Sequence, residues 1–142
     1  LKIGDGLELF SGNGFPYKQP INPYGLCVRR DGVLLPDDFR HEQYLLITEG
    51  SKRVLISGCS HRGIVNIVSW FAPDVLIGGF HFMKLDPQGS GKATLDAAVK
   101  ELTGYDTLYY TCHCTGVAQY EYLKAQMHDQ LQYLACGQEI TL

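Results

Sequence analysis

Three of the five histidines stand just past the end of an apolar run that we expect to be a β-strand: His61, His81 and His113. The strands are predicted over residues 53–57, 74–77 and 107–111. Because ligands of open α/β sheets bind beyond the carboxyl ends of the strands, the three imidazoles should meet at one edge of the sheet. Neutral imidazole is a common ligand of zinc and iron, so this pattern predicts a divalent metal site.

A cysteine adds a second kind of ligand to this edge. Cys59 precedes His61 by two positions in the run SGCSHRGIVN, which spans residues 57–66. Thiolate and imidazole are both preferred ligands of zinc, so Cys59 and His61 are predicted to bind the metal. The alternative interpretation of His61 is a turn histidine that caps the helix expected to follow it.

The other two histidines each allow two interpretations. His113 lies between Cys112 and Cys114, and neighbouring side chains of an extended chain point to opposite sides. Either the imidazole faces the metal or the two thiols do; we favour His113, with the thiols packing as small apolar groups. His81 follows two glycines that allow another group to approach the main chain closely, although a packed core histidine is the alternative.

Acidic residues cluster before the predicted strand at 44–48: Asp37, Asp38 and Glu42. A carboxylate near a metal acts as a ligand, as a proton acceptor or as the partner of a ligating histidine. Asp38 is our candidate for a catalytic acid–base residue, and a solvated loop is the alternative. The remaining histidines, His41 and His128, are expected to be solvated.

Two glycines, Gly63 and Gly116, begin predicted helices beside the candidate ligands. The first N–H groups of a helix lack acceptors and carry positive potential, which favours anions. A phosphate or carboxylate could bind at either place, with Arg62 and Lys84 adding positive charge.

Alternation of strand and helix in the second half predicts an α/β fold, in which helices pack on a sheet within one domain of residues 1–142. Residues 11–39 carry four prolines and are predicted to be a long irregular loop, either a lid over a substrate or a floppy connection. The other predicted elements are a strand over 7–11, a hairpin over 44–48 and 53–57, helices over 64–71 and 94–102, a long helix from Thr115 to Leu134, and a strand over 139–142.

Composition narrows the class of protein. With 45% hydrophobic and 19% charged residues, the chain is predicted to be globular and soluble. Its net charge of −3 disfavours nucleic acid or an anionic membrane as a partner. No apolar run approaches the ~20 residues needed to cross a bilayer. The odd number of cysteines favours free, buried or metal-bound thiols in a reducing cytoplasm.

Four motifs in this order resemble the C-terminal half of a metallo-β-lactamase-fold hydrolase. They are the acidic segment with Asp38, Phe39 and Glu42, then Gly58–Asn66, Gly78–His81 and His113–Gly116. Together they are similar in particular to the subfamily of 7,8-dihydropterin-6-methyl-4-(β-D-ribofuranosyl)-aminobenzene-5′-phosphate synthases. The His-x-His-x-Asp-His cluster of the superfamily is absent from the sequence, so the chain is expected to be a fragment whose missing cluster lies upstream of Leu1.

The resemblance implies half of an αββα sandwich, with a mixed sheet and helices on one face. It also implies His61, His113 and Cys59 as metal ligands and His81 as a ligand or proton donor. The implied cofactor is a divalent metal, zinc in the first place, with iron or manganese as alternatives. Two such metals would activate a bridging water to hydrolyse a small phosphorylated or ester-like substrate.

Two further expectations concern partners. The isolated chain should bind metal weakly, be inactive, and pair with the missing N-terminal half or self-associate as a dimer through its exposed sheet face. The alternative from another class is a non-catalytic metal- or thiol-based binding module that uses Cys59, Cys112 and Cys114.

Overall fold

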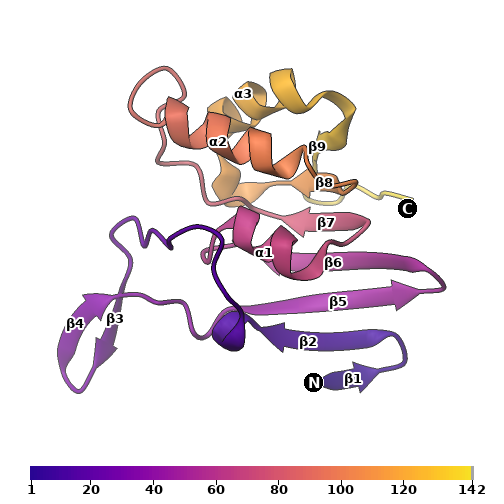
Figure 1. The fold of residues 1–142 in the computed structure, drawn as a ribbon, viewed down its shortest axis with the longest axis horizontal. Helices are drawn as coiled ribbons and strands as arrows, with labels where there is room; N and C mark the ends of the chain where they lie inside the picture. The colour runs from indigo at the N-terminus through magenta and orange to yellow at the C-terminus, as the bar shows by residue number, and fades with distance from the viewer. Residues whose placement is uncertain (142) are drawn as a thin grey trace.

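The computed structural model describes residues 1–141 and contains one large mixed sheet (Figure 1). Its seven strands lie in the order β1-β2-β5-β6-β7-β8-β9. Neighbours from β1 to β6 run antiparallel, and those from β6 to β9 run parallel. The strands are β1 (Lys2–Gly4), β2 (Leu7–Ser11), β5 (Gln43–Glu49), β6 (Lys52–Gly58), β7 (Val75–Gly78), β8 (Leu108–Thr111) and β9 (Leu131–Tyr133).

Three α-helices connect the parallel strands: α1 (Ile64–Phe71), α2 (Lys92–Leu102) and α3 (Val117–Met127). Short 3₁₀ turns are found at η1 (Gly12–Gly14), η2 (His113–Thr115) and η3 (His128–Gln130). Successive right-handed strand–helix–strand crossovers place their helices on the same face of the sheet. The predicted fold class, a mixed sheet with helices packed on one face, is confirmed. No helix within residues 1–141 is long and apolar enough to span a membrane.

The two faces of the sheet differ in how they are covered. One face packs under the helices and forms the core through Tyr44, Leu46, Leu55, Leu76, Tyr109 and Leu131. The opposite face is also apolar, because alternate residues of each strand point to it. Most of its side chains are half-buried or exposed: Leu9, Leu45, Ile47, Val54, Ile56, Ile77, Leu108 and Tyr110. Val75 is a buried exception. This chain therefore leaves one apolar sheet face without a covering layer.

The predicted C-terminal helix is wrong beyond Met127. Helix α3 ends there, His128 adopts φ 49° and ψ −128°, and the chain turns through η3 into strand β9. Leu131 pairs with Tyr109 of β8 and is fully buried. Residues 131–133, which the apolar spacing had predicted to be helical, therefore pair with the open edge of β8 as strand β9. The predicted strand over 139–142 is not formed by residues 139–141, and Leu142 lies outside the described residues.

The loop predicted over residues 11–39 is also more regular than expected. It contains η1 and a hairpin of two strands, β3 (Cys27–Arg30) and β4 (Val33–Pro36), joined at Asp31 and Gly32. Asp-Gly between two apolar runs is a strong hairpin signal. This hairpin stands away from the large sheet (Figure 1) and exposes Val33, Leu34 and Leu35.

Candidate functional site

The carboxylate of Glu42 organises the end of strand β6. Glu42 lies just before β5 and is 8% exposed. Its Oε1 accepts a hydrogen bond of 2.7 Å from the main-chain N–H of His61. Its Oε2 accepts from the main-chain N–H of Arg62 at 3.1 Å and from the hydroxyl of Tyr44 at 2.8 Å. One buried acid thus fixes the turn that carries His61.

The imidazole of His61 is held on three sides. Its Nδ1 lies 3.3 Å from Oε1 of Glu42, and its ring stacks on Phe39 with centroids 4.8 Å apart and an interplanar angle of 13°. The ring of His81 meets it edge-on at 4.4 Å. A carboxylate only accepts hydrogen bonds, so the nearby Oε1 of Glu42 favours a proton on Nδ1 and a lone pair on Nε2 of neutral His61. A lone pair on Nε2 can bind a metal or accept a proton.

His81 is the second imidazole of the site, and it is strained and unpaired. Its φ is 56°, a left-handed conformation that is uncommon outside glycine. Within residues 1–141, both of its ring nitrogens are buried without a hydrogen-bond partner. Burial lowers the pKa of His81, and the neighbouring His61 and Lys84 lower it further. Backbone strain and orphaned polar atoms both collect at functional sites.

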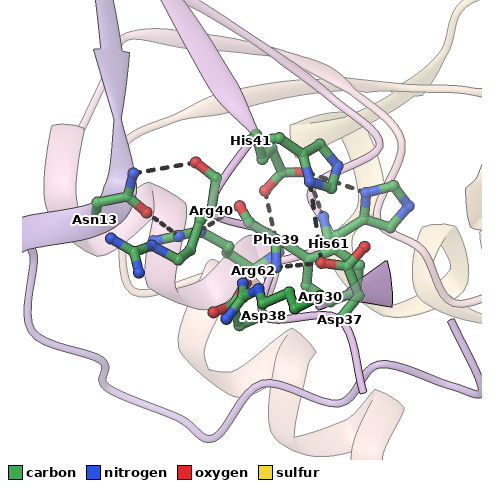
Figure 2. Close-up of polar contacts among 10 residues, drawn as sticks. Asn13, Arg30, Asp37, Asp38, Phe39, Arg40, His41, His61 and Arg62 are labelled. Carbon is green, nitrogen blue, oxygen red and sulfur yellow. Dashed lines mark hydrogen bonds and ion pairs between the residues drawn. The ribbon is translucent and has the colours of Figure 1, made fainter. Parts of the chain in front are cut away.

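Residues 12–24, which we call the strap, cross the start of α1 and are held there by two side chains of the SGCSHRGIVN run. The guanidinium of Arg62 donates to Phe39 O at 2.9 Å and to Asn13 Oδ1 (Figure 2). It also donates to the Tyr17 hydroxyl at 2.8 Å. Asn66 Oδ1 accepts from the main-chain N–H groups of residues 18 and 19, both at 2.8 Å. Arg62 is buried, and three of its N–H donors are used within the protein, so the structure gives it a role in holding the strap.

The strap covers a cavity of about 380 Å³ whose lining includes His61 and His81. Strap residues 19–24 form one wall, the start of α1 forms another, and α2 contributes Thr94 and Ala98. His61 and His81 stand at its end together with Ser60. The ring of Tyr24 lies edge-on to His81 at 5.6 Å between centroids, and Lys84 fixes the strap by donating to Tyr24 O at 2.8 Å. A small molecule in this cavity would contact both imidazoles.

The other predicted site residues lie outside this cluster. His113 is exposed in η2 and lines a separate shallow hollow with Tyr133 and Cys136. Asp38 forms an ion pair of 2.6 Å with Arg30 (Figure 2), and this guanidinium lowers the pKa of the Asp38 carboxyl. The structure thus brings together His61, His81 and Glu42, and it leaves His113 and Asp38 elsewhere.

Two of the thiols near the strand ends, those of Cys112 and Cys114, are poorly suited to act as thiolates. The buried thiol of Cys114 donates to Cys59 O at 3.4 Å. Burial raises the pKa of Cys114 to about 12, and burial also raises the pKa of Cys112. A protonated thiol is a poor nucleophile, so the raised pKa values of Cys112 and Cys114 weigh against a module in which these two thiols react directly.

A complete metal centre is not formed by this chain as described. Among residues 1–141, no group of three or more histidine, cysteine, aspartate or glutamate side chains is arranged to hold an ion. The residues fit a metal in part. His61 offers an Nε2 lone pair, its Nδ1 faces a buried carboxylate, and the remaining ligands have to come from elsewhere.

Sequence reasoning named Glu42 in the acidic cluster but favoured Asp38 as the catalytic residue, and it missed the contacts of Phe39 and Tyr24 with the two histidines. Glu42 stood in the acidic cluster, but its short distance to His61 depends on the pairing of β5 with β6. The sequence did contain one signal for a buried Glu42. Tyr44 lies two residues further on, and a buried tyrosine hydroxyl needs a hydrogen-bond partner such as a nearby carboxylate.

Comparison with known proteins agrees with this geometry. No protein-family profile matches the sequence. The crystal structure of Tm1679, a metal-dependent hydrolase of the β-lactamase superfamily, superposes on 100% of this chain and 56% of its own length, with a TM-score of 0.78 and 26% identity. The fold is that of the β-lactamase superfamily. An uncharacterized protein, MJ0448 of Methanocaldococcus jannaschii, is 30% identical over 94 residues.

Both matches are to longer proteins. The chain spans about half of Tm1679, and the match to MJ0448 covers 63% of this chain and 33% of that protein. This chain therefore corresponds to only part of each of these two proteins.

Proposed function

We propose that this chain is the part of a metal-dependent hydrolase of the β-lactamase superfamily that supplies His61 to the metal centre. The observation that carries the proposal is the buried Glu42 carboxylate, which contacts both the main-chain N–H and Nδ1 of His61. Carboxylates hold ligating histidines in this way because they fix the tautomer and raise the basicity of the other nitrogen. The neighbouring solved hydrolase supports the reaction class.

The cofactor would be a divalent metal, with zinc as the first choice because imidazole suits it. When bound, such a metal supplies Lewis-acid polarisation and a water of lowered pKa. In this chain, His61 would hold the ion, Glu42 would orient His61, and His81 would contact the substrate. His81 lies beside His61, has both nitrogens free of partners, and can move a proton at the leaving group. Cys59 and His113 stay candidate ligands, although His113 lines a different hollow.

The remaining ligands would come from a part of the protein outside this sequence or from a second polypeptide. Two observations support this: the described residues form no complete ligand group, and the chain spans only about half of the solved hydrolase. The uncovered apolar sheet face supplies a surface on which such a partner, or a second copy of the chain, can pack. The substrate would be a small phosphorylated or ester-like molecule. One example is the phosphorylated dihydropterin compound after which the subfamily resembled by the sequence motifs is named.

Metal binding tests this proposal in the chain alone. Calorimetric titration with zinc should show weak binding that His61→Ala abolishes and that Glu42→Gln weakens about tenfold. His128→Ala is the control, because His128 is an exposed histidine in η3 that does not line the cavity beside His61, and the substitution should leave the zinc affinity unchanged. Equal zinc affinity in the wild type and in His61→Ala would contradict the proposal.

A further inference from the structure

Two thiols from strands that are not neighbours meet beyond the end of β7. Cys59 follows β6, and Cys114 lies in η2, which follows β8, while β7 lies between these two strands in the sheet. The Sγ of Cys114 donates to the main-chain O of Cys59 at 3.4 Å. Burial raises the pKa of the Cys114 thiol most, and the Cys59 thiol raises it further by its charge and by a direct hydrogen bond. The two side chains are therefore in contact, although the residues lie 55 positions apart in the chain.

Two glycines at the end of β7 leave room for this contact. A Cβ on Gly78 would collide with the hydroxyl of Ser57, and a Cβ on Gly79 would collide with the Sγ of Cys114. Because neither glycine has a side chain, the segments that follow β6 and β8 approach each other across the end of β7. Cys114 packs beside Gly79 and is 3% exposed, whereas Cys59 is half-buried. A reagent in solution therefore reaches Cys59 before Cys114.

We propose that Cys59 and Cys114 are a redox pair that closes to a reversible disulfide when the chain meets a small-molecule disulfide such as oxidised glutathione. Cys59 loses its proton and attacks one sulfur of oxidised glutathione, and the leaving sulfur takes up a proton as a glutathione thiol. Cys114 then attacks the Cys59 sulfur of this mixed disulfide and releases the second glutathione thiol, which takes up the proton that Cys114 loses. Two cysteine thiols are oxidised, and one glutathione disulfide is reduced to two thiols.

The other cysteines are poorer partners for Cys59. Burial raises the pKa of Cys112, and the charge of Cys59 raises it further, so Cys112 is also near. Within residues 1–141, however, no hydrogen bond joins the side chain of Cys112 to Cys59. Cys27 is exposed on the hairpin of β3 and β4, and Cys136 is exposed in the hollow beside His113.

The disulfide would link two segments that carry candidate metal ligands. Cys59 precedes His61 by two positions, and Cys114 directly follows His113. Metals bind the thiolate form of cysteine, so a Cys59 sulfur held in a disulfide leaves the set of candidate ligands. Oxidation would therefore change the candidate site without a chemical change at His61. The pairing itself does not depend on the proposed hydrolase function, because it involves only thiols of this chain.

The experiment equilibrates the metal-free full chain with mixtures of oxidised and reduced glutathione at about pH 8. Remaining thiols are blocked after an acid quench, and the disulfides are mapped by mass spectrometry of non-reduced peptides. We expect a cross-link between Cys59 and Cys114 within one chain, which excess reduced glutathione removes. Cys59→Ser should leave Cys114 as a free thiol. Cys27→Ser removes an exposed cysteine outside the pair and is the control, which should form the cross-link to the same extent as the wild type.

Repeating the equilibration in concentrated urea separates a pair that is in contact in the fold from a chance encounter of two cysteines. In the unfolded chain the effective concentration of one thiol at the other should be on the order of millimolar or below. Folding should raise this effective concentration at least about 100-fold, because the two side chains already touch. An equal value in the folded chain and in urea, a cross-link from Cys59 to Cys112 in place of Cys114, or only a glutathione adduct on Cys59 would each overturn the inference. The zinc titration is a separate measurement, so failure of the hydrolase proposal would leave this result in place.

Discussion

Glu42 holds His61 at two points, since its Oε1 lies 2.7 Å from the main-chain nitrogen and 3.3 Å from Nδ1 of that residue. The two residues come from different elements, the entry to β5 and the exit from β6, which are neighbours in the sheet. Strand pairing therefore sets the geometry of the candidate ligand. The buried, fourfold-contacted carboxylate leaves the His61 ring little freedom to turn.

Replacing Arg62 should destabilise the whole chain. Arg62→Met removes the hydrogen bonds to Phe39 O, Tyr17 and Asn13 and leaves their acceptors without a buried donor. The expected loss is about 3 kcal/mol in the free energy of unfolding, measured by urea denaturation. Arg40→Met, at an exposed arginine, is the control and should stay within about 0.5 kcal/mol of the wild type. Similar losses in both variants would show that Arg62 does not hold the strap.

Asn66 should control the opening of the strap more than global stability. Asn66→Ala removes the acceptor for the N–H groups of Lys18 and Gln19 and the donor to Gln19 O. We expect hydrogen exchange at these two amides to become at least tenfold faster, about the factor for 1.4 kcal/mol. Ser69→Ala, on the same helix, should leave them protected. Unchanged exchange in Asn66→Ala would mean that other contacts hold the strap.

Exposed cysteines should react before buried cysteines whose pKa is raised. Cys27 and Cys136 are exposed, so iodoacetamide at about pH 8 should modify them first. Cys114 is buried with a pKa raised to about 12, so its thiolate fraction at that pH is very small. Mass spectrometry should find Cys114 unmodified until the chain is unfolded or the pH approaches that value. Early modification of Cys114 in the folded chain would contradict this environment.

The uncovered sheet face should drive self-association of the isolated chain. Ile56 lies at the centre of that face and is 37% exposed. Ile56→Glu should shift the chain towards monomer in sedimentation velocity, because the charge would be buried in the contact. Leu34→Glu changes an even more exposed leucine on the separate hairpin and should leave association unaltered. If only the Leu34 variant dissociates, the hairpin and not the sheet face is the contact.

Local sequence patterns correctly predicted an element whose ends are marked by residues that stop or start a helix. Helix α1 matches its predicted range because Gly63 precedes it and Ala72, in a left-handed conformation, ends it before Pro73. The strand-end positions of His61 and His81 followed from the same reasoning. The C-terminal helix failed because Leu131 suits a helix stripe and a buried strand equally well, and only the open edge of β8 decides between them.

The site could be predicted only in outline. Its histidines follow from the strand ends, but which of them meet depends on side-chain directions that spacing does not give. His61 meets His81, 4.4 Å away between ring centroids, and His113 faces a different hollow. The choice between Asp38 and Glu42 likewise depends on tertiary contacts: Asp38 pairs with Arg30 on the hairpin, while Glu42 reaches across to β6.

The most direct test of the account is the tautomer of His61, measured by long-range ¹H–¹⁵N NMR correlation with and without zinc. We predict that the proton of neutral His61 resides on Nδ1, facing Glu42, and that zinc shifts the resonance of Nε2. Glu42→Gln should reduce the population of this tautomer. A proton on Nε2 in the wild type, or a zinc-induced shift confined to Nδ1, would contradict the role of His61 as a metal ligand held by Glu42.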